Sequence, residues 1–256
     1  MRARCSTGCR SIPRSRWRAD IGIDVVIENG SAPSARVFDL DGTLVDTVGA
    51  RIAAWLRVFE ERAIPAHRDQ IAQLIGSDGR RLARIVAEAA ERPIDAAQAE
   101  SIDRRAGEIY DLLNTDPRPL PGVHSLLVVL EGRRIPWAIA TSSRSDQVDA
   151  SIHALHLSNR PTVIDGSHVQ HAKPAPDLLL AAAHELALEP ADIWYVGDST
   201  WDMEAANAAG MPAIGVATGA ATTVDLNNAG AQLTVDSLEQ LVPILAAFSL
   251  GADARP

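Results

Sequence analysis

The apolar residues between Val48 and about Pro117 recur every three to four positions, the spacing that places side chains on one face of a helix. Gly76-Ser77-Asp78-Gly79 and Arg92-Pro93 interrupt this pattern and are typical of turns. The segment is therefore predicted to form about four helices and no strand. The apolar positions that define the helical faces are Ile52, Trp55, Leu56 and Phe59, then Leu82, Ile85 and Val86, and then Ile102, Ile109, Leu112 and Leu113.

From Pro119 onward, short apolar runs alternate with amphipathic segments. The runs predict strands at 135–140, 162–164, 193–196, 213–216 and, more weakly, 232–235, with helices at about 122–133, 145–156, 175–187, 202–209 and 237–247. An earlier run, Ala35-Arg36-Val37-Phe38, predicts one more buried strand. Alternation of strands and helices implies right-handed crossovers and a parallel sheet, so we predict an α/β fold. In such sheets ligands bind at the carboxyl ends of the strands.

Composition narrows the class of protein. The chain has 256 residues, 46% of them hydrophobic, and a formal charge of −9. An acidic chain is a poor match for non-specific nucleic-acid binding, and no apolar run approaches the roughly 20 residues needed to cross a bilayer. Residues 1–34 begin with six arginines and no acidic residue before Asp20, and we expect them to be a disordered extension. Residues 248–256 are expected to be a tail.

Two carboxylates separated by one residue follow the strand that ends at Phe38, in Asp39-Leu40-Asp41-Gly42-Thr43. Side chains in this arrangement lean into one cleft, where one carboxylate can attack an electrophile and the other, when protonated, can serve a leaving oxygen. Gly42 permits the sharp turn that this requires. An acidic surface turn is the alternative explanation for this motif taken alone.

Three further features lie at strand ends or in a nearby loop. Thr141-Ser142-Ser143 follows the predicted strand at 135–140, and hydroxyl and backbone N–H groups before a helix can hold phosphate oxygens, although Ser and Thr are also ordinary helix caps. Lys173 is the only lysine in the chain and lies between alanine and proline, where it can neutralise phosphoryl charge or simply be a solvated loop residue. Asp198 and Asp202 follow the strand at 193–196, and carboxylates with open positions for water suit Mg²⁺.

In this order the four features resemble the haloacid dehalogenase superfamily, in its phosphoglycolate phosphatase and β-phosphoglucomutase branch, over about residues 35–245. The resemblance implies a Rossmann-like parallel sheet core with an inserted all-α cap. Residues 35–48 and 119–247 would form the core and residues 49–118 the cap.

The resemblance also implies roles for individual residues. Asp39 would be the nucleophile that forms an aspartyl-phosphate, and Asp41 would protonate the leaving alcohol and then activate water. Mg²⁺ would be held by Asp39, by the backbone carbonyl of Asp41 and by Asp198, with support from Asp202. The residues expected to hold the phosphoryl oxygens are Thr141, Ser142 and Lys173.

Residue counts separate the branches of the family. The cap segment contains no lysine, which excludes the Schiff-base chemistry of phosphonoacetaldehyde hydrolases and weakens, without removing, the alternative of a β-phosphoglucomutase-like mutase. The presence of Asp41 disfavours dehalogenation. A non-catalytic binding module is a second alternative. The presence of all four motifs argues against it. The preferred function is Mg²⁺-dependent hydrolysis of a small phosphorylated metabolite, of phosphoglycolate or sugar-phosphate type.

The cap segment supplies the expected contacts to the rest of the substrate. Among its 11 arginines, Arg80 and Arg81 follow the turn at 76–79, and we expect them to bind an anionic end of the substrate. The protein is expected to be cytoplasmic, to act as a monomer or homodimer, and to have no nucleic-acid or membrane partner.

Overall fold

The computed structural model describes residues 15–18, 24–27 and 33–249. Ser15–Arg18 (β1) and Asp24–Ile27 (β2) pair as antiparallel strands. Apart from these two strands and residues 33 and 34, the segment 1–34, which is expected to be a disordered extension, lies outside the described residues. Most of the expected tail, residues 248–256, also lies outside them. The two strands were not predicted, because the arginine-rich composition of this region obscured the β-branched run Val25-Val26-Ile27, which favours a strand.

A six-stranded parallel sheet forms the core, in the order β5 (Thr162–Ile164), β4 (Trp137–Ala140), β3 (Ala35–Phe38), β6 (Ile193–Gly197), β7 (Ala213–Val216) and β8 (Leu233–Val235). The first strand of the sheet in sequence, β3, is central and pairs with β4 on one side and β6 on the other. The predicted α/β fold and parallel sheet are confirmed. All four residues of β3 are buried, as a strand covered on both faces requires.

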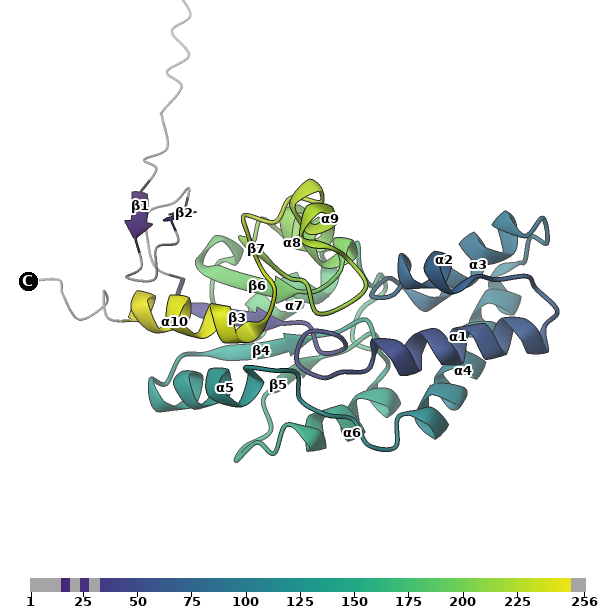
Figure 1. The fold of residues 1–256 in the computed structure, drawn as a ribbon, viewed down its shortest axis with the longest axis horizontal. Helices are drawn as coiled ribbons and strands as arrows, with labels where there is room; N and C mark the ends of the chain where they lie inside the picture. Colours follow the sequence, from purple (N-terminus) through teal and green to yellow (C-terminus); the bar gives the residue numbers. More distant parts are fainter. Residues whose placement is uncertain (1–14, 19–23, 28–32, 250–256) are drawn as a thin grey trace, which may run out of the picture.

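Helices cover both faces of the sheet (Figure 1). Buried residues of α5 (Val123–Gly132), α6 (Ser145–Ala154) and α10 (Leu238–Ser249) pack with Phe38 of β3 in one apolar cluster. Residues of α7 (Asp177–Glu185), α8 (Thr200–Ala209) and α9 (Thr223–Asn228) pack with Val37 in a second cluster. The short helix α9 was not predicted, because its six residues bury only Leu226 and so show no helical period. A 3₁₀ turn at Pro190–Asp192 precedes β6.

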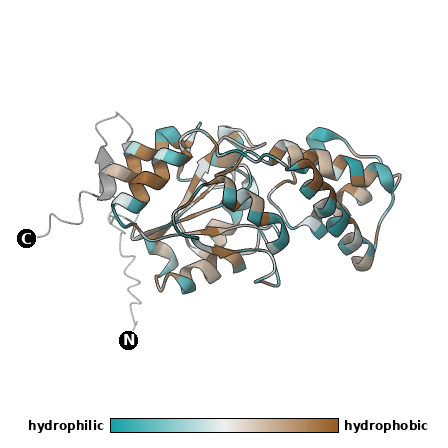
Figure 2. Ribbon diagram, turned by 90° about the horizontal axis from the view of Figure 1, so that it is seen from below, coloured by the Kyte–Doolittle hydropathy of each residue, from teal (hydrophilic) through white to brown (hydrophobic). Residues whose placement is uncertain are grey.

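Four helices form the inserted segment, as predicted: α1 (Val48–Glu61), α2 (Arg68–Ala72), α3 (Gly79–Ala89) and α4 (Ala96–Leu113). They share a separate apolar cluster, and Figure 1 shows them at one end of the molecule, beyond the sheet. The cap helices carry both hydrophobic and hydrophilic residues, whereas the central strands of the core are mainly hydrophobic (Figure 2). Leu112 and Leu113, predicted on a buried face, are 73% and 41% exposed, whereas Ile109 and Tyr110 just before them are buried. The domain boundaries at 48/49 and 118/119 stay predictions. The separate apolar cluster of the four inserted helices supports them.

Among the described residues, no helix is both long and apolar enough to cross a membrane.

Candidate active site

Three predicted site residues follow directly from the central strands. Asp39 comes after β3, Thr141 after β4 and Asp198 after β6. Because these strands are parallel neighbours, their carboxyl ends meet at one edge of the sheet, which is where such folds bind ligands. The cap helices lie beyond this same edge (Figure 1).

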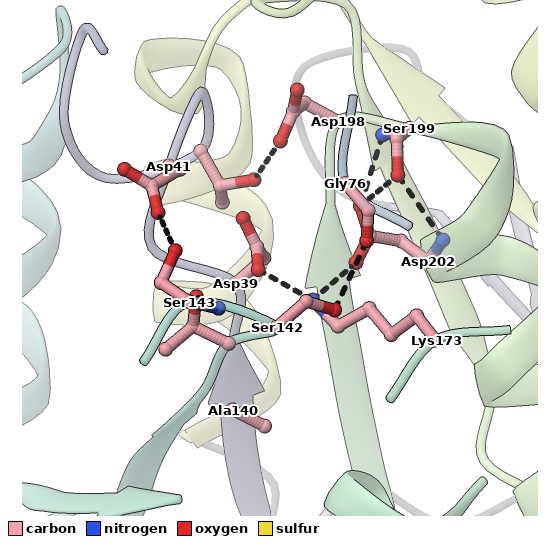
Figure 3. A network of polar contacts seen from close by, with 12 residues as sticks. Asp39, Asp41, Gly76, Ala140, Ser142, Ser143, Lys173, Asp198, Ser199 and Asp202 are labelled. Atoms are coloured by element: carbon pink, nitrogen blue, oxygen red, sulfur yellow. Dashed lines mark hydrogen bonds and ion pairs between the residues drawn. The ribbon is translucent and has the colours of Figure 1, made fainter. Parts of the chain in front are cut away.

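Lys173 connects two of the predicted carboxylates. Its side chain is fully buried, and its ammonium forms ion pairs with Asp39 and, at 2.7 Å, with Oδ1 of Asp202 (Figure 3). Burial lowers the pKa of Lys173, but the two carboxylates outweigh that effect and hold the pKa above its ordinary value. The only lysine of the chain is therefore a fixed positive charge under the nucleophile candidate.

Asp202 uses both carboxylate oxygens on protein donors. Its Oδ1 accepts from the hydroxyl of Tyr195 at 2.7 Å in addition to Lys173, and its Oδ2 accepts from the backbone N–H and the hydroxyl of Ser199 at 3.0 and 2.5 Å. A carboxylate offers about four acceptor positions. In this arrangement Asp202 orients Lys173 and the start of α8, and it has little capacity left for a direct bond to a metal ion.

Asp198 is placed differently. Its Oδ1 accepts from the Thr43 hydroxyl at 2.7 Å, while Oδ2 lies against the turn at Gly42. Gly42 has φ +86°, and a Cβ there would be 2.4 Å from Oδ2, so only glycine lets the two loops approach this closely. Burial raises the pKa of Asp198 well above its usual range, and the neighbouring carboxylates Asp202 and Asp39 add to the shift.

The residues present fit a divalent cation. Carboxylate oxygens of Asp39, Asp198 and Asp202 lie within 4.8 Å of one another, and all three residues are buried, so Asp39 and Asp198 could bind an ion directly with Asp202 beside them. Burial raises the pKa of Asp39 to about 7, against the opposing effect of Lys173 and with help from Asp202 and Asp41. One lysine leaves this buried group with an excess of negative charge, and a hard cation with oxygen ligands is the group that would compensate it.

Asp41 faces a different set of partners from Asp39. One oxygen accepts from the hydroxyls of Thr47 at 2.7 Å and Tyr110 at 3.2 Å. The other accepts from Arg51 at 2.9 Å and from Ser143 at 2.5 Å. Figure 3 shows its carboxylate on the Ser143 side, apart from the Lys173 pairs.

The environment of Asp41 favours its ionised form. Burial by itself would raise the pKa of Asp41, but the guanidinium of Arg51 and the hydroxyls of Ser143 and Thr47 outweigh it and hold the pKa below its ordinary value. Arg51 lies in the first turn of α1, with its guanidinium 3.7 Å from the centroid of the Tyr110 ring. The two aspartates of one turn therefore have pKa values shifted in opposite directions.

The cap touches the core through its loop at 76–78. Ser142 donates to the carbonyl of Gly76 at 3.0 Å, and the backbone N–H of Asp78 donates to the carbonyl of Lys173 at 3.0 Å. Trp201 packs against the cap cluster and donates to the carbonyl of Gln73 at 3.0 Å. The loop is thus bonded to predicted phosphate-binding residues on the core.

A cavity of about 500 Å³ lies between core and cap. Asp39, Thr141 and Ser142 line it from the core side, and Arg80 lines it from the cap. Arg80 is paired with Asp78 at 2.7 Å. Arg81 is not among the residues that line this cavity, and its guanidinium lies 5.2 Å from the ring centroid of Trp201. The structure therefore brings one of the two predicted cap arginines to the cavity.

The contacts of several residues that line the cavity were not predicted from the sequence. Arg51 and Ser143 hold Asp41, and Arg144 forms ion pairs with Glu100 and Asp103 of α4 at 2.8 and 2.6 Å. Ser143 is the last residue of the predicted Thr141-Ser142-Ser143 motif and Arg144 directly follows it, so this motif already indicated where both residues lie. Glu100 and Asp103 carry no local signal, because only the packing of α4 brings them to the cavity.

Comparisons with known proteins agree with the fold and with the predicted family. The family model described as haloacid dehalogenase-like hydrolase matches residues 36–216. A probable phosphatase, IndB, of Dickeya dadantii is 31% identical over 80% of this chain and 90% of its own length. The β-phosphoglucomutase of Bacillus subtilis is 30% identical over 72% of this chain and 84% of its own. The crystal structure of a hydrolase from Pseudomonas syringae superposes with a TM-score of 0.80 and 30% identity, covering 84% of this chain and 98% of that one. The predicted resemblance is confirmed, and the chain belongs to the haloacid dehalogenase-like hydrolase family.

Proposed function

We propose that this protein is a Mg²⁺-dependent phosphatase that hydrolyses a small phosphorylated metabolite through an aspartyl-phosphate on Asp39. The observation that supports this most strongly is the position of Asp39: its buried carboxylate lines the cavity at the end of the central strand and is paired with Lys173. Phosphoryl transfer depends mainly on positioning and on neutralising charge, and this site supplies both.

In the first half of the reaction, Asp39 attacks phosphorus and the bond from phosphorus to the alcohol oxygen breaks. Asp41 gives a proton to that oxygen, so the alcohol leaves neutral. Lys173, Thr141 and Ser142 hold the phosphoryl oxygens. Asp39, Asp198 and the backbone carbonyl of Asp41 would hold Mg²⁺, which supplies charge neutralisation to the phosphoryl group when bound.

In the second half, Asp41 takes a proton from water, and the hydroxyl attacks phosphorus to release phosphate and restore Asp39. The contacts of Asp41 suit this step, because Arg51 and the hydroxyls of Ser143 and Thr47 stabilise its ionised form. An ionised carboxylate is the form that acts as a general base. The role of general acid requires Asp41 to bind a proton against these contacts, so they must loosen when a substrate occupies the cavity.

The test is release of phosphate from p-nitrophenyl phosphate with and without Mg²⁺. We expect activity that chelation removes and Mg²⁺ restores, and we expect Asp39→Asn to lose it. Asp116→Asn, which removes a carboxylate from an exposed ion pair with Arg118 instead, is the matched control and should keep the activity. Equal activity in Asp39→Asn and the parent enzyme would refute the nucleophile assignment.

A mutase is the second candidate, because the B. subtilis β-phosphoglucomutase is similar over most of this chain. Such an enzyme would convert glucose 1-phosphate into glucose 6-phosphate when primed with a bisphosphate. Conversion that outpaces phosphate release would favour the mutase over the phosphatase. The cytoplasmic location and the monomeric or dimeric state stay predictions.

A further inference from the structure

Five charged side chains of the cavity lining form ion pairs that do not involve Asp39 or Asp41, and we name them the cap-side charge cluster. Its members are Asp78, Arg80, Glu100, Asp103 and Arg144, and all of them line the cavity. Three carboxylates and two guanidinium groups give the cluster a formal charge of −1. Arg144 comes from the core and the others from the cap, so the cluster spans the cavity.

Each guanidinium of the cluster already has a carboxylate partner. Nη2 of Arg144 donates to Glu100 at 2.8 Å and to Asp103 at 2.6 Å, and Arg80 pairs with Asp78 at 2.7 Å. The remaining arginine of the cavity lining, in the described part of the chain, is Arg51, which pairs with Asp41. No arginine of this lining therefore presents a positive charge without a nearby negative one.

A substrate with a second anionic group would meet this cluster unfavourably. A carboxylate or second phosphate that binds the guanidinium of Arg144 or Arg80 would lie beside Glu100, Asp103 or Asp78, whether it takes a free N–H group or displaces one of these acids. Like charges in a partly desolvated site cost binding free energy, and such repulsion is a source of specificity.

A neutral polyhydroxylated alcohol has no such conflict. Its hydroxyl groups can donate to carboxylate oxygens and accept from the guanidinium N–H groups that Arg144 does not use for Glu100 and Asp103. The size of the cavity agrees: about 500 Å³ lies within the usual range for small-molecule sites, and a two-carbon acid would fill little of it.

We propose, on the basis of the phosphatase function above, that the cap-side charge cluster selects phosphate esters of neutral polyhydroxylated alcohols and rejects esters that carry a second anionic group. Glu100 and Asp103 are the specificity-determining residues, because they occupy the guanidinium of Arg144. Phosphoglycolate and bisphosphates are then poor substrates, and Arg80 does not serve as the receptor for an anionic end.

The test compares two substrates of equal chain length, sorbitol 6-phosphate and 6-phosphogluconate, which differ in a terminal hydroxymethyl or carboxylate group. We expect kcat/KM to be at least tenfold higher for the neutral ester. Equal values, or a preference for the anionic ester, overturn the inference. So does failure to hydrolyse either ester by an enzyme that hydrolyses p-nitrophenyl phosphate. Absence of Mg²⁺-dependent activity on p-nitrophenyl phosphate would instead refute the proposed function itself.

Charge variants then assign the selection to particular residues. Glu100→Gln/Asp103→Asn frees Arg144, and we expect the preference for the neutral ester to fall at least tenfold through a gain on 6-phosphogluconate. Arg144→Gln leaves both acids without their partner and should increase the preference. Glu61→Gln removes a carboxylate from the surface pair with Arg105, outside the cavity, and should leave the preference unchanged.

An unchanged preference in the folded double variant, or the same change in Glu61→Gln, would overturn the assignment. If the double variant does not fold, Glu100→Gln alone serves, because Glu100 is 40% exposed and tolerates the change best. It should shift the preference in the same direction by a smaller factor.

Discussion

The two sides of the cavity are built in different ways. On the core side, the charged residues grouped around Asp39 are at most 3% exposed: Lys173 and Asp198 lie in loops that follow parallel strands, and Asp202 lies in the first turn of α8. On the cap side, the charged groups are 17 to 45% exposed and lie on helices or at their ends. Charges held rigidly out of water act strongly on a reacting group, whereas half-exposed pairs are weaker and easier to exchange. The core side therefore suits the chemistry that every substrate shares, and the cap side suits discrimination between substrates.

The largest effect should come from removing the charge at the centre of the core side. Lys173→Met leaves Asp39 and Asp202 without their common cation, and breaking a buried ion pair in this way costs about 3–5 kcal/mol of unfolding free energy. Activity on p-nitrophenyl phosphate should fall by about 10² to 10³, as for loss of one charge-stabilising donor. Denaturant unfolding and steady-state kinetics measure the two effects.

A matched substitution at the surface tests whether burial is the reason that loss of Lys173 lowers the free energy of unfolding so much. Arg118→Met breaks the pair with Asp116, in which both side chains are more than 70% exposed, and should change stability by no more than about 1 kcal/mol. Adding Asp202→Asn to Lys173→Met should recover part of the stability and none of the activity. If Lys173→Met were as stable as the parent protein, the buried ion pairs of the core side would be no stronger than the half-exposed pairs of the cap side, and the contrast between the two sides would be wrong.

Asp41 contacts Ser143 of the core and Tyr110 of the cap. We expect its substitution to lower kcat/KM by different factors for different substrates. Asp41→Asn removes the proton donor, so kcat/KM for an alkyl phosphate should fall by about 10², the lower end of what general acid–base catalysis contributes. The fall for p-nitrophenyl phosphate should be much smaller, because p-nitrophenolate leaves without a proton. Equal losses on both esters would show that Asp41 serves binding or folding rather than proton transfer.

The core side could be predicted from the sequence far better than the cap side. Asp39, Thr141 and Asp198 each follow a short apolar run, and strand order places the ends of those runs together, so local pattern was enough. Even there, the sequence did not show that Asp202 would have both oxygens occupied by Lys173, Tyr195 and Ser199. That depends on side-chain geometry.

On the cap side, the missing information was helix packing. The meeting of Arg144 with Glu100 and Asp103 depends on how α4 lies over the core, which no local pattern specifies. Arg81 was expected in the cavity beside Arg80, but adjacent residues on a helix point in directions about 100° apart. Arg81 lies instead against Trp201.

Removing the contact between Arg51 and Asp41 should have a smaller effect, a shift of the pH–rate profile in a defined direction. Arg51 lowers the pKa of Asp41, so Arg51→Met should raise that pKa. The protonated acid then persists to higher pH, and the limb of the pH–rate profile that falls with rising pH should move to higher pH for alkyl phosphates. Arg57→Met, on the exposed face of the same helix, is the control and should leave the profile in place. A profile that moves to lower pH in Arg51→Met contradicts the assignment.

The smallest effect should arise at the loop that joins the two sides. Gly76 has φ +92°, and a Cβ there would be 2.6 Å from the Ser199 hydroxyl, so Gly76→Ala should lower the free energy of unfolding by about 1–2 kcal/mol. Because Ser142 donates to the Gly76 carbonyl, displacement of this loop should also raise KM more than it lowers kcat. Gly132→Ala is the matched control: it lies at the end of α5 with no heavy atom within 4 Å of the added Cβ, and the change should be neutral or stabilising by up to about 1 kcal/mol. Equal responses of the two variants would show that the approach of cap to core at this loop places no constraint on the site.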